Sequence, residues 1–312
     1  MNRPLLAAVL AVLTLAAPAF AEGDAPPRLK RPRLDVVFAI DTTGSMGDEI
    51  DVVKQRLQQM VAEIGAGRPK PDVRFGMVAY KDRGDEYVVH PVPLSRDVNA
   101  FYAEVRALSA SGGGDEPEDV AAALTWAIDR MNWDKDREVT RLLFLIGDAG
   151  PHHYPGEASM TTLAARAKEK RIKINTIGCS GLVGEAEEAF RTLALRSGGK
   201  FDVLTYRQIV ATADGHKRTV LTRGGETFAA DGELSDEDWK KGADVVARAG
   251  VAKKVTTGGW LSGAGAGVAD RAAPGRSMAP SAVAPVTVGE NNLDALITSE
   301  IKASATKAGV AY

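Results

Sequence analysis

A carboxylate and two hydroxyls stand at alternate positions in the stretch Asp41-Thr42-Thr43-Gly44-Ser45. The stretch follows an apolar run and precedes a helical pattern, so Asp41, Thr43 and Ser45 lie on a predicted strand-to-helix turn and can converge on one point. Backbone N–H groups at a helix N-terminus favour anionic groups there. Oxygen ligands of this kind suit a hard cation such as Mg²⁺. The spacing therefore predicts a metal site.

Two predicted elements position this turn. Residues 36–40 form an apolar run with the length and β-branched content of a buried strand. After the turn, apolar residues recur at helical spacing and predict a helix over 47–64. The turn therefore lies at the carboxyl end of a strand, which is where open α/β sheets bind their ligands.

The chain up to about residue 204 continues to alternate between strand and helix patterns. This alternation implies a doubly wound α/β fold, a mostly parallel sheet with helices on both faces. Pro91 and Pro93 mark the strand that contains them as an edge or irregular strand. Further strands are predicted at 73–80, 87–94, 142–146, 172–179 and 200–204, and further helices at 98–108, 118–131, 160–170 and 185–196.

Two other acids stand next to predicted elements of this fold. Asp148 comes just after the very hydrophobic run at 142–146, a probable central strand. Glu118 follows the glycine-rich loop at 109–117, before a helical pattern. Because the carboxyl ends of parallel strands meet at one edge, Asp148 is expected near Asp41.

These stretches resemble, in order, the metal-binding segments of the von Willebrand factor A (integrin I-like) family. Asp41–Ser45 resembles the family's D-x-S-x-S motif, with Thr43 in place of the first serine. Gly113–Glu118 is similar to the second metal loop of integrin β-type members, and Arg141–Ala149 to the strand that carries a third acid. The resemblance covers about residues 34–204 and does not reach the C-terminal third.

The resemblance implies a domain at 34–212 with a metal-ion-dependent adhesion site. Neutral hydroxyls among the ligands leave the cation electron-poor, and an Asp or Glu of a partner protein can complete its shell. The implied ion is Mg²⁺, or Mn²⁺ or Ca²⁺, and the implied function is metal-dependent protein binding, in adhesion or scaffolding, with no enzymatic activity. The implied ligands are Asp41, Thr43, Ser45, Glu118 and Asp148.

Flanking cation sites are a further implication of the integrin β likeness. Asp48 and Glu49 follow the motif as acids do in that subgroup. Asp82 stands where the subgroup has an acid for another cation, which Asp115 and Glu118 could complete. Plainer interpretations stay open: Asp48 and Glu49 as acids in the first turn of a helix, and Asp82 as a solvated loop acid.

A serine hydrolase is the alternative function. Thr43-Gly44-Ser45-Met46-Gly47 nearly matches the G-x-S-x-G nucleophile elbow and has the required strand–turn–helix setting. The first glycine of the elbow is missing, however. Asp148 and His152 would also have to supply the acid and the base from a single loop. Metal-dependent protein binding is therefore the preferred interpretation.

The N-terminus predicts export. A positive Arg3, an apolar core at 5–17 and the small-x-small site Ala19-Phe20-Ala21 indicate a signal peptide at 1–21, followed by an extended leader at 22–33. No later stretch is apolar enough to cross a bilayer. The formal net charge of −2 gives no reason to expect nucleic-acid binding. The protein is therefore expected in the periplasm or outside the cell.

The C-terminal third has a different character. Residues 213–255 are expected to form a hairpin around a Gly-Gly turn and then a helix capped by Ser235 that runs to residue 249. Residues 256–289 are rich in Gly, Ala, Ser and Pro, which predicts a disordered linker. Residues 290–312 contain a short amphipathic helix, expected to dock on the protein's own surface.

Overall fold

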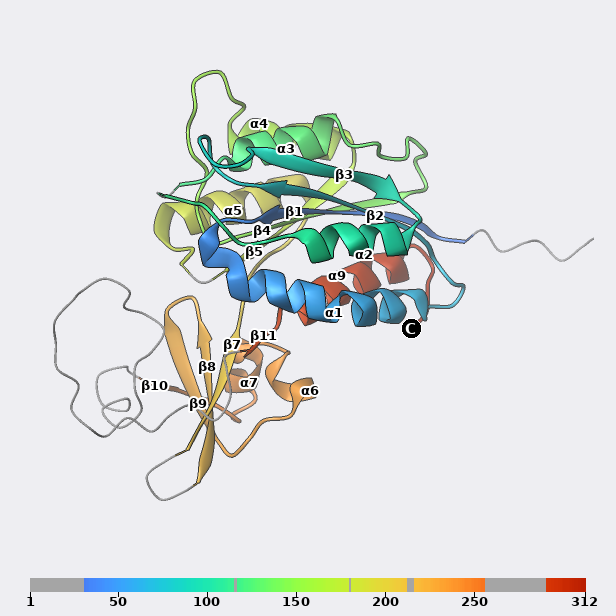
Figure 1. Cartoon of the computed structure of the whole chain (residues 1–312). Helices are drawn as coiled ribbons and strands as arrows, with labels where there is room; N and C mark the ends of the chain where they lie inside the picture. The colour runs from blue at the N-terminus through green and yellow to red at the C-terminus, as the bar shows by residue number, and fades with distance from the viewer. Residues whose placement is uncertain (1–30, 115–116, 180, 212–215, 256–289) are drawn as a thin grey trace, which may run out of the picture. The chain divides into compact units, whose positions relative to one another are not determined.

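A mostly parallel sheet forms the centre of the computed structural model. The model describes residues 31–114, 117–179, 181–211, 216–255 and 290–312. The strands of this sheet are β1 (Arg33–Asp41), β2 (Asp72–Tyr80), β3 (Val89–Ser95), β4 (Thr140–Gly147), β5 (Ile172–Gly178) and β6 (Phe201–Val203). Their order is β3-β2-β1-β4-β5-β6, and all neighbours are parallel except β3, which pairs antiparallel with β2 at the edge (Figure 1).

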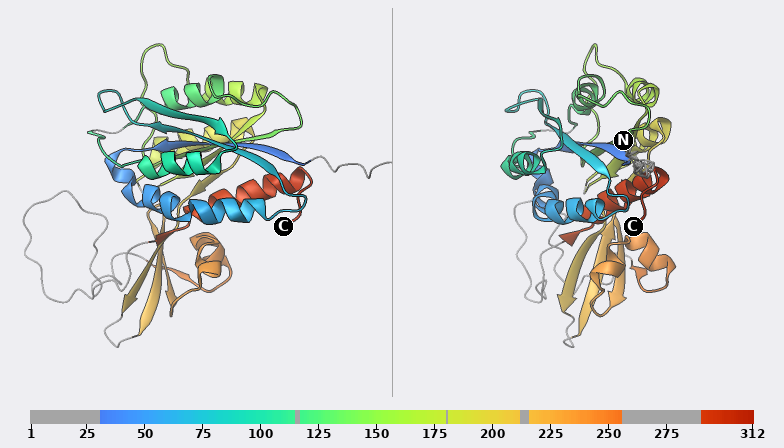
Figure 2. Two further views of the ribbon diagram at one scale, coloured as in Figure 1. Left: turned by 45° about the vertical axis from the view of Figure 1, so that its right-hand side comes forward. Right: turned by 90° about the vertical axis from the view of Figure 1, so that its right-hand side faces the viewer.

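Helices cover both faces of this sheet, which explains why β1 is almost entirely buried. Alternate residues of β1 serve different cores: Phe38 and Ile40 belong to one, Val37 and Ala39 to the other. The first core contains α1 (Gly47–Gly65), α2 (Val98–Ala107) and α9 (Leu293–Lys307), and the second contains α3 (Val120–Asp129), α4 (Met160–Glu169) and α5 (Gly184–Ser197) (Figures 1 and 2). The predicted doubly wound α/β fold is confirmed.

The C-terminal helix α9 is part of the first core. It packs beside α1 (Figure 2), and its Ile297 and Ile301 are fully buried. The Lys302 ammonium also donates a hydrogen bond to the Glu63 carboxylate of α1 at 2.9 Å. The helix therefore docks on the protein itself, as its amphipathic pattern indicated.

Shortening one buried side chain of α9 tests this packing. Ile301→Val is expected to lower the free energy of unfolding by about 1 kcal/mol, because it removes one methylene from a filled core. Urea unfolding measures the change. Ser299→Ala, on the exposed side of the same helix, is the control and should stay within about 0.5 kcal/mol of the wild type. Equal stability of wild type and Ile301→Val would contradict the packing.

A second, antiparallel sheet follows β6. Its strands are β7 (Tyr206–Ala211), β8 (Lys217–Arg223), β9 (Glu226–Asp231), β10 (Lys253–Val255) and β11 (Glu290–Asn291), in the order β10-β9-β8-β7-β11. The predicted hairpin is present as β8 and β9, joined at Gly224 and Gly225. Although β7 lies within the predicted 34–212 domain, it pairs with β8 in this second sheet.

The predicted long helix after Ser235 is wrong in its extent. Ser235 does cap a helix, accepting a hydrogen bond from the Asp238 amide, but α6 (Asp236–Trp239) is short. A separate helix, α7 (Ala243–Arg248), begins after Gly242, whose φ of +99° cannot continue a helix. The break lets Trp239 bury its side chain completely in a small core with α7 and the sheet.

Several sequence predictions concern parts of the chain that the structure does not describe. The signal peptide at 1–21, most of the leader at 22–33 and the linker at 256–289 lie outside the described residues. Of the helices that the structure does describe, none combines the length and the apolar character needed to span a membrane.

Candidate metal centre

The predicted site lies at the carboxyl ends of two adjacent central strands. Asp41 is the last residue of β1, and Asp148 follows β4, its parallel neighbour. The chain leaves β1 toward β2 on one side, while β4 lies on the other side, so this is the topological switch point of the sheet. The fold thus places the first and third predicted acids at the edge where α/β sheets bind ligands.

The turn after β1 draws its three predicted ligands together. The Thr43 hydroxyl donates a hydrogen bond to Asp41 Oδ1 at 2.7 Å, and the Thr43 amide donates to the same oxygen at 2.9 Å. The Ser45 hydroxyl lies 3.4 Å from that of Thr43. A 3₁₀ turn, η1 (Gly44–Met46), then leads into α1. Asp41 and Thr43 are buried, whereas Ser45 is exposed, so the hydroxyls lead from the interior to the surface.

The glycine-rich loop packs directly on this turn. The Gly44 amide donates to the Gly112 carbonyl, and the Ser111 amide donates to the Thr42 carbonyl, both at 3.1 Å. Gly113 has a φ of +76°, and a Cβ on it would lie 2.8 Å from Thr43 Cβ and 3.4 Å from Glu118 Oε1. Only glycine fits there without strain.

Glu118 is held between the glycine-rich loop and the loop after β4. Its amide donates to the Gly150 carbonyl at 2.9 Å, and its carbonyl accepts from the His152 amide at 2.8 Å. The Glu118 side chain is only 2 % exposed. Because Gly113 lies against both Thr43 and Glu118, the structure places this acid near the Thr43 side chain.

Burial and mutual repulsion perturb the acids. Burial, with a smaller contribution from Asp148, raises the pKa of Asp41 to about 7, although the two Thr43 hydrogen bonds oppose the shift. Burial and the charges of Asp41, Asp82, Asp85 and Asp148 raise the pKa of Glu118 to about 8. Ionising both acids would therefore place repelling negative charges at this point, and a cation there would relieve the repulsion.

The residues present fit a hard divalent cation. Asp41 Oδ2 and Glu118 Oε2 are buried and have no hydrogen-bond partner among the residues that the structure describes, which is costly unless another group engages them. The donors are carboxylate and hydroxyl oxygens, the ligand type that Mg²⁺ prefers. Among the described residues, no three His, Cys, Asp or Glu side chains are placed to hold a metal by themselves. A metal site here would therefore need the hydroxyls of Thr43 and Ser45 as well as the acids.

The residues predicted for flanking cations have other surroundings. Asp48 is exposed in the first turn of α1, while Glu49 is buried and accepts a hydrogen bond from the Tyr206 hydroxyl. The Tyr154 hydroxyl donates a bifurcated hydrogen bond to the two carboxylate oxygens of Asp82, at 2.7 and 2.9 Å. Glu49 thus ties the start of α1 to β7, and Asp82 anchors the loop after β4. Asp115 lies outside the described residues.

Ser45 lacks the partners of a hydrolase nucleophile. Its hydroxyl lies 3.4 Å from the Thr43 hydroxyl, and within the described part of the chain no histidine is hydrogen-bonded to it. His152 instead stacks on Tyr154, with ring centroids 4.1 Å apart, and its Nδ1 lies 3.8 Å from Asp82. The structure therefore offers no support for the serine hydrolase alternative.

The sequence analysis missed several residues that shape the site. The Lys81 ammonium, on a side chain that is 2 % exposed, donates to the carbonyl and to the hydroxyl of Ser111, the latter at 2.9 Å. The Asp85 carboxylate accepts from the Gly113 amide at 3.1 Å. The buried Tyr80 hydroxyl lies close to Gly147 beneath Asp41. Lys81 directly follows β2, and its position at the carboxyl end of a strand was the sequence feature that could have indicated its place near the site.

Removing the Lys81 charge should loosen the glycine-rich loop. Lys81→Met deletes the donors to Ser111 and leaves a carbonyl without its partner, so we expect the free energy of unfolding to fall by about 1–2 kcal/mol. Amide hydrogen exchange at Ser111 and Gly44 should also accelerate. The exposed Lys168→Met is the control and should change neither quantity. Unaltered exchange at Ser111 in Lys81→Met would show that Lys81 does not hold the loop.

Comparison with known proteins agrees with this geometry. Residues 35–216 match the family model for the von Willebrand factor A domain. The human von Willebrand factor A domain-containing protein 7 is 30% identical over 212 residues, and its rat counterpart is 29% identical over 211. Each match covers 64% of this chain and 21% of the relative, so the chain spans about a fifth of the length of these relatives.

Two solved structures are also similar to part of this chain. BatB, a conserved hypothetical protein from Bacteroides thetaiotaomicron, is 17% identical with a TM-score of 0.42, and the match covers 55% of this chain and 89% of BatB. Proximal thread matrix protein 1 of the mussel byssus is 15% identical with a TM-score of 0.41, covering 55% of this chain and 42% of that one. Since the family model matches more than half of the chain, including the strands and loops that carry the predicted ligands, the protein belongs to the von Willebrand factor A domain family.

Proposed function

We propose that this protein binds another protein in a metal-dependent manner, in adhesion or scaffolding, and is not an enzyme. Domains of this family are generally non-enzymatic protein-interaction modules. The observation that carries the proposal is the meeting of buried acids with two hydroxyls, where Asp41 Oδ2 and Glu118 Oε2 find no hydrogen-bond partner in the described part of the chain. The cation would be Mg²⁺, or alternatively Mn²⁺ or Ca²⁺.

Each member of the ligand set has its own role in this proposal. Thr43 and Ser45 would hold the cation directly through their hydroxyls. Asp41, Glu118 and Asp148 would hold it directly or through water and would balance its charge. Bound in this way, the cation would supply a Lewis-acidic position that accepts a carboxylate oxygen from an Asp or Glu of the partner. The exposure of Ser45 supports this arrangement, since a partner approaching from solvent meets the hydroxyl end of the set.

We further propose that the protein works outside the cytoplasm, in the periplasm or the extracellular space. This part rests on the charged, apolar and small-residue pattern at 1–21. The partner is then a protein of the same compartment. Neither the net charge nor the site suggests a nucleic-acid ligand.

Affinity capture tests the proposed function. The immobilised chain is exposed to an envelope extract in Mg²⁺ and in EDTA, alongside Asp148→Asn and the exposed control Asp51→Asn. The wild type and Asp51→Asn should retain the same protein in Mg²⁺ and release it in EDTA, whereas Asp148→Asn should not retain it. Retention that is independent of both EDTA and Asp148 would refute metal-dependent binding.

A further inference from the structure

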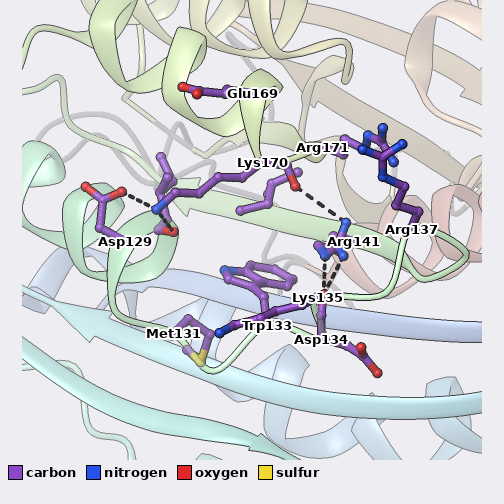
Figure 3. A pocket seen from close by; sticks show the side chains of 12 residues that line it. Asp129, Met131, Trp133, Asp134, Lys135, Arg137, Arg141, Glu169, Lys170 and Arg171 are labelled. Atoms are coloured by element: carbon purple, nitrogen blue, oxygen red, sulfur yellow. Dashed lines mark hydrogen bonds and ion pairs between the residues drawn. The ribbon is translucent and has the colours of Figure 1, made fainter.

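A cavity of about 450 Å³ opens at the end of the sheet opposite to the candidate metal centre. Its walls come from the ends of α3 and α4, the loop at 130–139, and the first residues of β4 and β5 (Figure 3). The candidate metal centre uses the other ends of the same strands. The volume lies within the range of small-molecule sites in proteins. The cavity is therefore separate from the proposed metal site.

One wall of this cavity is apolar and held in place. Ile128, Met131 and Ile172 line it and are themselves almost fully buried. The Trp133 indole also lines it, and its Nε1–H donates to the Ala127 carbonyl at 2.7 Å. That hydrogen bond fixes the orientation of the ring. The wall thus offers a preformed surface for a flat apolar group.

A buried cation lies in the same cavity. Arg141 is 6 % exposed and donates to the carbonyls of Asp134 and Lys170 (Figure 3). It also donates to the Asp136 carbonyl, and none of these acceptors is a carboxylate. Carbonyl dipoles satisfy its N–H groups but do not cancel its net charge. Charges buried in proteins are normally paired with an opposite charge. The carbonyl groups around Arg141 therefore leave its positive charge uncompensated.

Three more cations stand at the mouth of the cavity. For Lys135, Arg137 and Arg171 the structure records no ion pair or side-chain hydrogen bond to any residue it describes. Of the acids that line the cavity, Asp129 pairs with Lys170 and Arg166, and Asp134 pairs with Arg33. Glu169 is the lining acid for which no cation partner is recorded in the described part. Arg137 and Arg171 lie away from Asp129 in Figure 3. The cavity therefore has an excess of positive charge.

The backbone at Arg171 provides an independent observation. Its φ of +57° makes it the only non-glycine residue with positive φ among those the structure describes. It follows the C-cap of α4, at a position where glycine is the usual residue, because a left-handed conformation is strained for an L-residue with a side chain. A cation at a helix C-terminus gains some dipole energy, but a lysine or arginine one turn earlier gains it without strain. Strain of this kind points to a role for the side chain.

We propose that this cavity binds a small organic anion, with a carboxylate or phosphate head on a flat apolar body. Arg137 and Arg171 would contact the head by charge-assisted hydrogen bonds, with Lys135 beside them. The Trp133 ring and its apolar neighbours would pack against the body. Buried Arg141 would add to the positive potential from below. The site combines an apolar wall with a few convergent polar groups, the usual composition of a ligand pocket.

Ligand titration in EDTA tests this proposal without involving the metal centre. The full chain is titrated with phenyl phosphate, benzoate, inorganic phosphate and benzyl alcohol, and the shift of the Trp133 indole N–H resonance is followed by NMR. Phenyl phosphate or benzoate should saturate with a Kd of about 0.1–1 mM, as expected for ligands of about ten heavy atoms. Inorganic phosphate and benzyl alcohol should bind at least about tenfold more weakly. Inorganic phosphate lacks the flat apolar body, and benzyl alcohol lacks the anionic head.

Two variants and a matched control complete the test. Arg171→Gly suits the left-handed backbone, so it should fold at least as stably as the wild type while binding about tenfold more weakly. Arg137→Ala should weaken binding similarly. Arg196→Ala, an exposed arginine outside the cavity, should leave it unchanged. Absence of saturable binding, equal affinity in Arg171→Gly and Arg137→Ala, or equally tight inorganic phosphate would each overturn the proposal.

Discussion

Asp41→Asn is expected to abolish the stabilisation of this protein by Mg²⁺ while leaving the fold intact. At a Mg²⁺ concentration of about 100 times its Kd, the wild type should gain about 2.7 kcal/mol of unfolding free energy. For a domain of this size that gain raises the melting temperature by about 5–10 °C. The variant should lose at least about 100-fold in affinity, since even outer-shell partners of metal ligands contribute about 10–100-fold. Differential scanning fluorimetry with and without Mg²⁺ measures the effect.

Asparagine is the informative substitution because it keeps an acceptor for the Thr43 amide and hydroxyl, both of which bond to Asp41 Oδ1. It also removes a buried charge that lies near Asp148. Without metal, Asp41→Asn should therefore be at least as stable as the wild type at pH 8. Asp51→Asn, an exposed acid of α1, should keep the full Mg²⁺ response. A full Mg²⁺ response in Asp41→Asn would remove Asp41 from the ligand set.

Raising the pH should destabilise the metal-free protein, and Mg²⁺ should reverse the loss. The pKa of Asp41 is raised to about 7, that of Glu118 to about 8, and that of Glu49 to about 7, in each case chiefly by burial. Between about pH 4.5 and these values the folded chain keeps protons that the unfolded chain has released. The free energy of unfolding therefore falls as pH rises, by up to about 1.4 kcal/mol per pH unit for each proton retained.

Urea unfolding at pH 5.5, 6.5, 7.5 and 8.5, in EDTA and in Mg²⁺, measures this dependence. The slope against pH should be negative in EDTA and flatter in Mg²⁺, because the cation stabilises the ionised forms of Asp41 and Glu118. Glu49→Gln separates the contribution of the third acid, whose partner is the Tyr206 hydroxyl rather than the proposed ligands. Stability in EDTA that increases with pH over this range would contradict the raised pKa values.

Much of the fold was predictable because the local patterns agree with the tertiary structure. The apolar run at 36–40 lies in the centre of β1, whose two faces are both covered by helices. Alternate residues of this strand pack into the two cores. Where the predictions differ from the structure, tertiary contacts decide. Gly242 looks like a tolerable glycine in a helical pattern, yet its positive φ separates α6 from α7. Nothing local marks β7 as a partner of β8 rather than of the parallel sheet.

The site was predictable to the extent that its residues stand at strand ends. Asp41 and Thr43 are joined by hydrogen bonds within one turn, and Asp148 follows an adjacent strand. Lys81 was not predicted, because a lysine in an acidic loop is usually exposed to solvent. Its burial against Ser111 depends on a loop thirty residues away in the sequence. The cavity around Arg141 was also missed, since its residues come from separate elements whose meeting only the fold reveals.

The most direct test of a cation held by these side chains is anomalous diffraction from crystals grown with Mn²⁺, which has the same preference for oxygen ligands. We predict an anomalous peak within about 2.0–2.4 Å of the Thr43 and Ser45 hydroxyl oxygens, with Asp41, Glu118 and Asp148 around it. Density for Mn²⁺ elsewhere, with these five side chains at their present positions and no peak among them, would contradict the account.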